Sequence, residues 1–277
     1  MLVHLIAKFL PATVTDSLLS QIQTIRWPEV KFSPQNIFIT PQTQIRIIPH
    51  VNEFDFVYLF KKGLVYEAEV FNFLASKVKS YEAIVEIGAN IGIYTCYFSA
   101  IAKTAEIYVF EPSPKAYSRL LNNLAHNPNP NVHTYNVALS KDTGFQSFYE
   151  PVGHLTNGSL LREFAHIFSK ELHITPALSI SGTLLNQVLR NHKNILIKID
   201  VEGAEADVLT SLKEVIQSKH PDIILEVLPN FDEQLSQLTF LTDNYQLLNI
   251  TESGLVPQSS FHGNLQARDY FLTPKSD

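Results

Sequence analysis

Short apolar runs rich in β-branched residues alternate with segments of helical periodicity from residue 84 to residue 272. The runs are predicted strands, at residues 84–87, 106–110, 132–137, 195–199, 223–227, 245–250 and 269–272. The segments between them predict helices at residues 91–102, 114–126, 204–218 and 231–241. Strands that are apolar throughout are typical of a largely parallel sheet with helices on both faces. We therefore predict an α/β fold with a doubly wound, mostly parallel sheet.

The N-terminal part of the chain differs from this alternation. Residues 1–62 predict a helix at 16–25 and then β-rich runs at 36–40, 44–48 and 54–60. We interpret them as a small α+β extension or cap, followed by a main domain over residues 63–277. A helix over residues 67–78 is predicted to open that domain.

Residues 140–181 lack a regular period and are predicted as a long irregular connection between the third and fourth strands. Long connections at the ligand-binding end of such a sheet commonly form lids or substrate walls. Within it, Asn157, Gly158 and Ser159 are candidates for substrate contact, although a plain turn explains them equally well.

Composition narrows the class of protein. Of the 277 residues, 45% are hydrophobic, enough for one large domain with a modest extension. The formal charge of −6 makes nucleic acid an unexpected partner. Cys96 is the single cysteine, so no intrachain disulfide can form, and its apolar neighbours predict a buried side chain. The apolar start of the chain is too short to span a bilayer, and we expect a cytoplasmic protein.

A glycine loop follows the first core strand, with the sequence Glu86-Ile87-Gly88-Ala89-Asn90-Ile91-Gly92. Glycines at such a turn let a ligand approach the backbone. A dinucleotide site usually carries G-x-G-x-x-G, whereas Asn90 takes the place of the middle glycine here. The second strand ends at Glu111, where an acidic side chain can accept both hydroxyls of a ribose. The loop is therefore better suited to a nucleoside cofactor that lacks a pyrophosphate.

Four segments of the chain together resemble the FkbM-type methyltransferases. They are the loop at 86–92, Phe110-Glu111-Pro112, Asn136-Val137-Ala138 and the charged segment at 198–205. The pair Tyr66-Glu67 also fits the pattern of this family, and the resemblance covers roughly residues 63–273. One departure is Glu86, where the family usually has Asp. The resemblance implies a class I, Rossmann-like fold, S-adenosylmethionine as methyl donor, and O-methylation of a small molecule, commonly a sugar or a macrocyclic natural product.

The resemblance also implies positions for the cofactor. The methionine end would lie along Glu86, Gly88, Ala89, Asn90 and Gly92, and Glu111 with Pro112 would hold the ribose. The adenine would be flanked by Asn136, Ala138 and Leu139. Tyr66, Glu67 and Asp200 complete the expected contacts with the cofactor.

The fourth core strand ends in the charged segment Lys198-Ile199-Asp200-Val201-Glu202-Gly203-Ala204-Glu205. So many charges at the end of an apolar strand are costly unless they are paired or used. Methylation of a hydroxyl needs a group that takes its proton. We predict Asp200 at the reactive centre, as general base or metal ligand, with Glu202 as a second acid and Lys198 as the partner of both. The alternative is an internal network, including Glu205, that only fastens the turn.

A metal site would use oxygen ligands from neighbouring strand ends, and Asp200 with Glu226 are the candidates. Two acids are too few to predict a site, so Mg²⁺ is allowed but not expected. Four of the ten histidines, His154, His166, His173 and His262, lie in the irregular or loop segments and are interpreted as surface residues.

Three functions remain open on the sequence alone. The first is an O-methyltransferase acting on a hydroxylated small molecule. The second is an NAD(P)-dependent oxidoreductase, which the missing middle glycine disfavours. The third is a catalytically silent binding module, which the acids at 86, 111 and 200 disfavour. The sequence leaves the oligomeric state open, a homodimer included.

Overall fold

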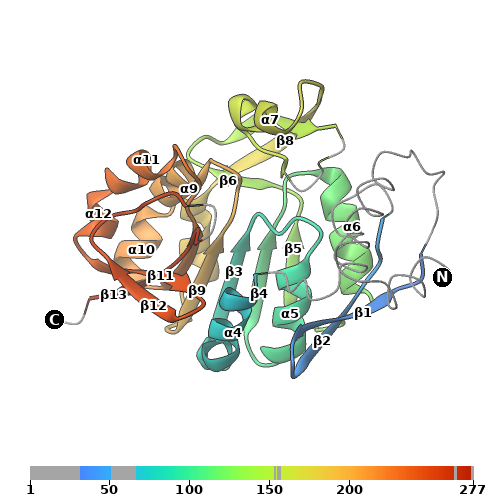
Figure 1. Cartoon of the computed structure of the whole chain (residues 1–277), viewed down its shortest axis with the longest axis horizontal. Coiled ribbons are helices and arrows are strands. Elements are labelled where there is room, and N and C mark those ends of the chain that lie inside the picture. The colour runs from blue at the N-terminus through green and yellow to red at the C-terminus, as the bar shows by residue number, and fades with distance from the viewer. Residues whose placement is uncertain (1–31, 51–66, 153, 155–156, 265–266, 276–277) are drawn as a thin grey trace.

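The computed structural model describes residues 32–50, 67–152, 154, 157–264 and 267–275, and its centre is an eight-stranded sheet (Figure 1). The strand order is β12-β11-β13-β10-β9-β3-β4-β5. The strands are β3 (Ala83–Ile87), β4 (Glu106–Phe110), β5 (Val132–Tyr135), β9 (Ile195–Ile199), β10 (Asp222–Glu226), β11 (Tyr245–Thr251), β12 (Gly254–Gln258) and β13 (Asp269–Pro274). Strands β5, β4, β3, β9 and β10 are mutually parallel, whereas β13 is antiparallel to both of its neighbours.

Helices cover both faces of this sheet, which confirms the predicted doubly wound fold. On one face lie α4 (Ala68–Lys77), the 3₁₀ turn η1 (Val78–Ser80), α5 (Ile93–Ile101) and α6 (Pro114–Leu124). On the other lie the 3₁₀ turn η3 (Gly182–Leu184), α8 (Leu185–Val188), α9 (Glu205–Ser211), α10 (Lys213–Lys219), α11 (Asp232–Ser236) and α12 (Thr239–Thr242). None of the described helices is both long and apolar enough to cross a bilayer.

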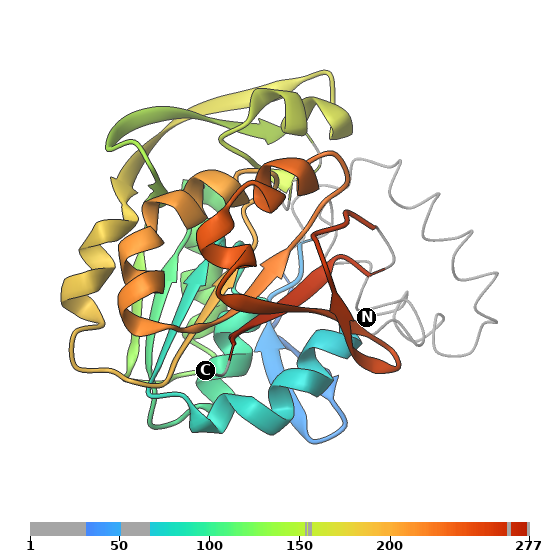
Figure 2. The same ribbon diagram turned by 90° about the vertical axis from the view of Figure 1, so that its left-hand side faces the viewer.

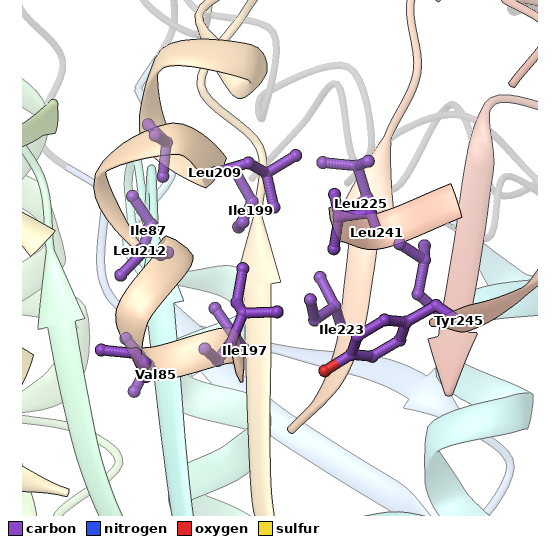
Figure 3. Close-up of a cluster of buried hydrophobic side chains, with 14 of the residues drawn as sticks. Val85, Ile87, Ile197, Ile199, Leu209, Leu212, Ile223, Leu225, Leu241 and Tyr245 are labelled. Atoms are coloured by element: carbon purple, nitrogen blue, oxygen red, sulfur yellow. The ribbon is translucent and has the colours of Figure 1, made fainter. Parts of the chain in front are cut away.

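Side-chain alternation along the central strands builds two cores. Val85, Ile87, Ile197 and Ile199 pack against α9 and α10, as Figure 3 shows. Their neighbours along the strands, such as Ile84, point to the α4–α5 face. Each fully buried aliphatic side chain contributes on the order of 1.5–3 kcal/mol to folding. The two cores fix the strand ends relative to one another, and the functional residues extend from those ends.

The predicted helices at 204–218 and 231–241 are each divided in two. The first breaks at Leu212, where φ is −91° and ψ is 0°, between α9 and α10. Ser211 contributes to this break, since its hydroxyl donates a hydrogen bond back to the Val208 carbonyl within the last turn. Strand β12 was not predicted, because most of its side chains are exposed and carry no alternating pattern.

The prediction of an irregular connection over residues 140–181 was wrong. This segment forms most of a second sheet of three strands, β6 (Ala138–Ser140), β8 (Leu172–Ser181) and β7 (Gly144–Pro151), with α7 (Arg162–Phe168). The usual alternation is obscured because Phe145 and Ile174 face solvent and because β8 contains Pro176, a residue that is rare within strands. In Figures 1 and 2 this small sheet and α7 lie above the main sheet, near the ends of β3 and β4.

The described part of the N-terminal segment is the hairpin of β1 (Gln35–Thr40) and β2 (Thr43–Ile47), as predicted. Ile39, Ile45 and Ile47 are buried and share a core with α4 and α5, and Figure 2 shows the hairpin beside these helices. The predicted helix at 16–25 and strand at 54–60 lie outside the described residues. A division into residues 1–62 and 63–277 stays a prediction.

Candidate active site

The carboxyl ends of β3, β4, β9 and β10 meet at one edge of the sheet, the usual ligand position in folds of this kind. A cavity of about 460 Å³ lies there. Its walls include most of the predicted site residues: Glu67, Glu86, Gly88, Ala89, Asn90, Glu111, Pro112, Ala138, Leu139, Lys198, Asp200, Glu202 and Glu226. Gly92 and Asn136 lie outside this lining, and Tyr66 lies outside the described residues.

The glycine loop is shaped by close contact between two strand ends. Gly88 has φ of +85°, and a Cβ built on it would lie 1.7 Å from the carbonyl oxygen of Asp200. The Asp200 amide donates a hydrogen bond to the Ile87 carbonyl at 3.0 Å, which holds the end of β9 against the loop. Gly92, with φ of +83°, precedes α5 and packs on Leu120 of α6. The glycines thus serve backbone packing as well as ligand access.

Glu111 follows the end of β4 and stabilises the glycine loop at residues 86–92. Its Oε2 accepts a hydrogen bond from the Asn90 amide at 2.7 Å, and its Oε1 accepts one from the Ser113 amide at 2.8 Å. Asn136 orients the same segment, because its side-chain amide donates to the carbonyls of Glu111 and Pro112. Each carboxylate oxygen of Glu111 has a second lone pair and the residue lines the cavity, so it can also accept a hydrogen bond from a hydroxyl.

Glu150 of β7 was not identified from the sequence. Its side chain is buried, and its Oε1 accepts a hydrogen bond from the Ser113 hydroxyl. It reaches the core because the small sheet folds back over the main one, an arrangement that a segment without periodicity does not reveal.

Glu86 and Lys198 are direct neighbours across the β3–β9 pair and both are buried. The Thr95 hydroxyl donates to Glu86 Oε2 at 2.7 Å. Burial raises the pKa of Glu86 to about 7, although Lys198 and Thr95 oppose this shift. Lys198 Nζ lies 2.9 Å from Asp200 Oδ2 and 4.2 Å from the centre of the Tyr94 ring.

Burial also shifts the pKa values of Lys198 and Asp200 toward their neutral forms, but the attraction between the two charges outweighs this effect. Desolvation works to lower the pKa of Lys198, yet Asp200, Glu67 and Glu86 hold it above its ordinary value. Desolvation works to raise the pKa of Asp200, yet Lys198 and Arg268 hold it below its ordinary value. The pair is therefore an ammonium beside a carboxylate at neutral pH.

Three acidic side chains gather beyond this pair. Asp200, Glu202 and Glu226 each offer a carboxylate oxygen, and these oxygens lie within 4.8 Å of one another. The chain turns sharply after Asp200, with φ of +56° at Glu202 and +97° at Gly203. Glu205 fastens the turn, because its Oε1 accepts hydrogen bonds from the amides of Val201 and Gly203, both at 3.1 Å. Glu205 thus has the structural role that the alternative interpretation gave it.

Arg268 is the main site residue that the sequence did not reveal. Its guanidinium lies 3.0 Å from Glu67 Oε1 through Nη2 and 2.9 Å from Glu226 Oε1 through Nε. It precedes β13, whose antiparallel direction places its first residue, Asp269, opposite Glu226 at the end of β10. Glu67 begins α4 with φ of +42° and also accepts a hydrogen bond from the Tyr94 hydroxyl.

The small sheet and its connections form the remaining wall. Phe148, His154, Asn157, Gly158, Leu160 and Phe168 line the cavity from this side. Ser159 does not line it, and its hydroxyl donates to the Glu202 carbonyl at 2.8 Å. His166, His173 and His262 lie outside the lining. All four of these histidines are exposed, as interpreted from the sequence, although His154 also borders the cavity.

Three buried carboxyls predict a pH-dependent stability. Burial raises the pKa values of Glu86, Glu111 and Glu205 to about 7. Because these values exceed those of an unfolded chain, the stability from each group is present below about pH 4.5 and is lost as pH rises through about 7. The loss for one group is on the order of 1–3 kcal/mol. We expect the free energy of unfolding, measured in urea, to fall between about pH 5 and 8.

Glu205→Gln separates this effect from other titrations. The amide oxygen can still accept from Val201 and Gly203, while the buried charge is removed. The variant should show a shallower fall in stability with pH than the unchanged protein. Glu233→Gln, at an exposed position of α11, is the control and should keep the full slope. Equal slopes in both variants would contradict the assignment to Glu205.

Comparison with known proteins assigns the chain to a family. The model of the methyltransferase FkbM domain matches residues 86–251. The hexuronic acid methyltransferase AglP of Haloferax volcanii is 31% identical over 152 residues, which cover 55% of this chain and 59% of that protein. Methyltransferase 1 of Beauveria bassiana is 27% identical over 155 residues, covering 51% of this chain and 61% of that protein. The chain therefore spans about three fifths of the length of these relatives.

Solved structures with a similar arrangement are also methyltransferases. Methyltransferase FkbM from Methylobacillus flagellatus aligns with a TM-score of 0.40 and 14% identity, over 78% of this chain and 54% of that one. An S-adenosylmethionine-dependent O-methyltransferase from Thermotoga maritima aligns with a TM-score of 0.42 and 10% identity, over 83% of this chain and 73% of that one. The mostly parallel, doubly wound sheet agrees with the class I, Rossmann-like fold that the family resemblance implied, whereas the antiparallel direction of β13 was not predicted. With the family match over residues 86–251, the chain belongs to the FkbM methyltransferase family.

Proposed function

We propose that this protein is an S-adenosylmethionine-dependent O-methyltransferase that acts on a hydroxyl group of a small molecule, in the class of sugars, glycans and natural-product scaffolds. One observation carries the proposal. The carboxylates of Asp200 and Glu202 line the same cavity as the glycine loop and Glu111, so that a cofactor on the loop would lie beside groups that can take a proton.

The residues present fit the cofactor. The cavity volume of about 460 Å³ falls within the range of small-molecule sites, roughly 300–1,000 Å³. Gly88, Ala89 and Asn90 line it, and Glu111 adds a carboxyl group at the end of β4. We assign the methionine end to the loop, the ribose to Glu111, and the adenine to the wall at Ala138 and Leu139. S-adenosylmethionine would supply an electrophilic methyl group there.

The acidic end of the cavity favours a neutral acceptor. When a hydroxyl oxygen attacks the methyl carbon, the carbon–sulfur bond breaks, and the hydroxyl proton passes to a carboxylate or to water. Asp200 is the carboxylate best placed for this, with Glu202 as a second acid and Lys198 holding Asp200 ionised. An anionic carboxylate acceptor would need no base, and Asp200, which Lys198 holds ionised, would repel it.

The relative AglP gives a starting point for the acceptor, since its name is that of a hexuronic acid methyltransferase. A hexuronic acid offers both hydroxyls and a carboxyl group. We propose that a hydroxyl is methylated here, for the electrostatic reason above. Phe148, Leu160 and Phe168 give the opposite wall an apolar surface that suits a sugar ring face or a macrocycle.

Cofactor binding is tested by calorimetric titration of S-adenosylhomocysteine, with NADH as the comparison. We expect binding of the first and none of the second. Glu111→Ala should weaken S-adenosylhomocysteine binding by about 10-fold or more, because buried hydrogen bonds to a charged acceptor contribute roughly 1.5–3 kcal/mol. Glu106→Ala, which removes a more exposed acid at the start of β4, should bind as the unchanged protein does. An unchanged dissociation constant in Glu111→Ala would refute the ribose assignment.

The acceptor is tested by incubating the protein with S-adenosylmethionine and a set of hydroxylated sugars, hexuronic acids and macrocyclic scaffolds. Mass spectrometry detects methylation, and treatment with mild base separates a stable ether from a labile ester. We expect a base-stable product. An ester as the only product would overturn the hydroxyl assignment while leaving methyl transfer in place.

A further inference from the structure

We propose that Asp200, Glu202 and Glu226 form a binding site for a hard divalent cation, and that this cation holds the acceptor's hydroxyl oxygens. The site deepens the proposed O-methyltransferase function and rests on it for its role in the reaction. Binding of the cation itself can be measured independently of that reaction.

The backbone brings the three carboxylates together. Strands β9 and β10 are parallel and pair Ile199 with Leu225, so the next residues, Asp200 just after β9 and Glu226 at the end of β10, lie side by side. The left-handed backbone at Glu202 turns the chain back toward them. One carboxylate oxygen from each residue lies within 4.8 Å of the others. Oxygens bound to one Ca²⁺ lie about 2.3–2.6 Å from it. Two oxygens on opposite sides of the ion are therefore separated by about twice that distance, which is close to the 4.8 Å limit found for the three carboxylate oxygens.

Glu226 supplies a second observation that points to a missing ligand. The residue is 4% exposed, and its Oε1 is occupied by Arg268. Its Oε2 is buried and accepts no hydrogen bond from any described residue, although the side chain lines the cavity. A buried carboxylate oxygen without a partner is costly, and native proteins rarely leave one unsatisfied. A cation between Glu226 and its two acidic neighbours would satisfy it.

The local charge balance also favours a cation. Glu67, Glu86 and Asp269 are further acids near the three-carboxylate cluster, while Lys198 and Arg268 are the basic side chains that act on it among the described residues. Lys198 is paired with Asp200, and Arg268 is shared between Glu67 and Glu226. Glu202 has no ion pair in the described part of the chain, and its Oε1 accepts a hydrogen bond from Asn157 Nδ2 at 3.5 Å. Within the cluster, Glu202 thus lacks a basic partner among the described residues, and Glu226 shares its own with Glu67.

A cation at this place would have a direct chemical role. Three carboxylates leave open positions on a six- to eight-coordinate ion, and water or a pair of neighbouring sugar hydroxyls can fill them. Coordination lowers the pKa of a bound hydroxyl and orients its oxygen. As that oxygen bonds to the methyl carbon, the carbon–sulfur bond breaks with its electrons on sulfur, and the hydroxyl proton leaves to water. The products are the methyl ether and S-adenosylhomocysteine.

The test uses Mn²⁺ as a spectroscopic probe with the full chain. Electron paramagnetic resonance and calorimetry should find one bound Mn²⁺ per chain, which Mg²⁺ or Ca²⁺ displaces. Glu226→Gln keeps an oxygen for Arg268 but loses a charged ligand, and it should raise the Mn²⁺ dissociation constant at least about 10-fold. Glu202→Gln should do the same, whereas Glu233→Gln on the surface of α11 should bind as the unchanged protein does.

Thermal unfolding shows whether a variant that fails to bind Mn²⁺ is still folded. Mn²⁺ should raise the Tm of the unchanged protein and of Glu233→Gln, and raise it less in the two cluster variants. Lack of binding by the unchanged protein at about 1 mM Mn²⁺ would overturn the proposal, as would equal binding by Glu226→Gln. Methyl transfer that persists unchanged in excess EDTA would remove the cation from the reaction but leave the O-methyltransferase proposal standing. Failure to bind S-adenosylhomocysteine would instead overturn the proposed function alone.

Discussion

Substituting Asp200 by Asn is expected to lower kcat by at least about 100-fold while leaving the affinity for S-adenosylhomocysteine close to that of the unchanged protein. Asn has the size of Asp and can still accept a hydrogen bond from Lys198, which lies 2.9 Å away. It cannot take a proton from an acceptor hydroxyl, and as a neutral ligand it holds a cation weakly. Turnover and calorimetric affinity are measured on the same preparation.

The matched control is Asp207→Asn, which removes an acid from the exposed side of α9, where it pairs with Lys141. We expect normal turnover from this variant. The Tm of Asp200→Asn is also informative, because Lys198 loses its nearest counter-charge. A lower Tm with normal kcat would show that Asp200 only fastens the strand end, and the reactive-centre assignment would then be wrong.

Gly88→Ala is expected to destabilise the protein by about 3 kcal/mol or more and to abolish tight S-adenosylhomocysteine binding. A left-handed backbone costs an alanine about 1–2 kcal/mol. In addition, the new Cβ would overlap the Asp200 carbonyl oxygen, which is 1.7 Å from its ideal position. The ends of β3 and β9 must then separate, and the loop moves away from Glu111. Urea unfolding measures the first effect and calorimetry the second.

Gly254→Ala separates the two costs. Gly254 also has a positive φ, of +104°, but a Cβ there would meet no atom within 4 Å. This variant should lose only the conformational part, about 1–2 kcal/mol, with normal cofactor affinity. If Gly88→Ala behaved like Gly254→Ala, the close approach of the two strand ends would not determine the geometry of the loop.

The main sheet could be predicted from the sequence because its strands are buried on both faces. Runs such as residues 84–87 and 195–199 are buried along their whole length and are apolar except for Glu86 and Lys198, and a chain with that pattern has few alternatives to a covered parallel sheet. Strand ends then meet at one edge by topology, so Glu86, Glu111 and Asp200 could be placed together without a structure.

The residues that escaped prediction depend on tertiary contacts that leave no local pattern. Phe145 and Ile174 are exposed, so β7 and β8 lack the alternation that marks a half-buried strand, and Glu150 was missed with them. Arg268 lies in a loop with no periodicity, and its place in the site follows only from the direction of β13. Sequence periodicity indicates which side chains are buried. The positions of Glu150 and Arg268 depend instead on how distant segments of the chain are arranged in the fold.

The insertion of β13 between β10 and β11 has a consequence for the order of folding. Strands β10 and β11 precede β13 in the chain, yet neither pairs with the other, and the contacts of both are completed by residues 269–274. During synthesis the ribosome must therefore release this segment before the sheet can close. Arg268 directly precedes β13, so its guanidinium can pair with Glu226 and Glu67 only once this segment has been added to the sheet. Assembly of the acidic site is thereby coupled to completion of the chain as far as β13.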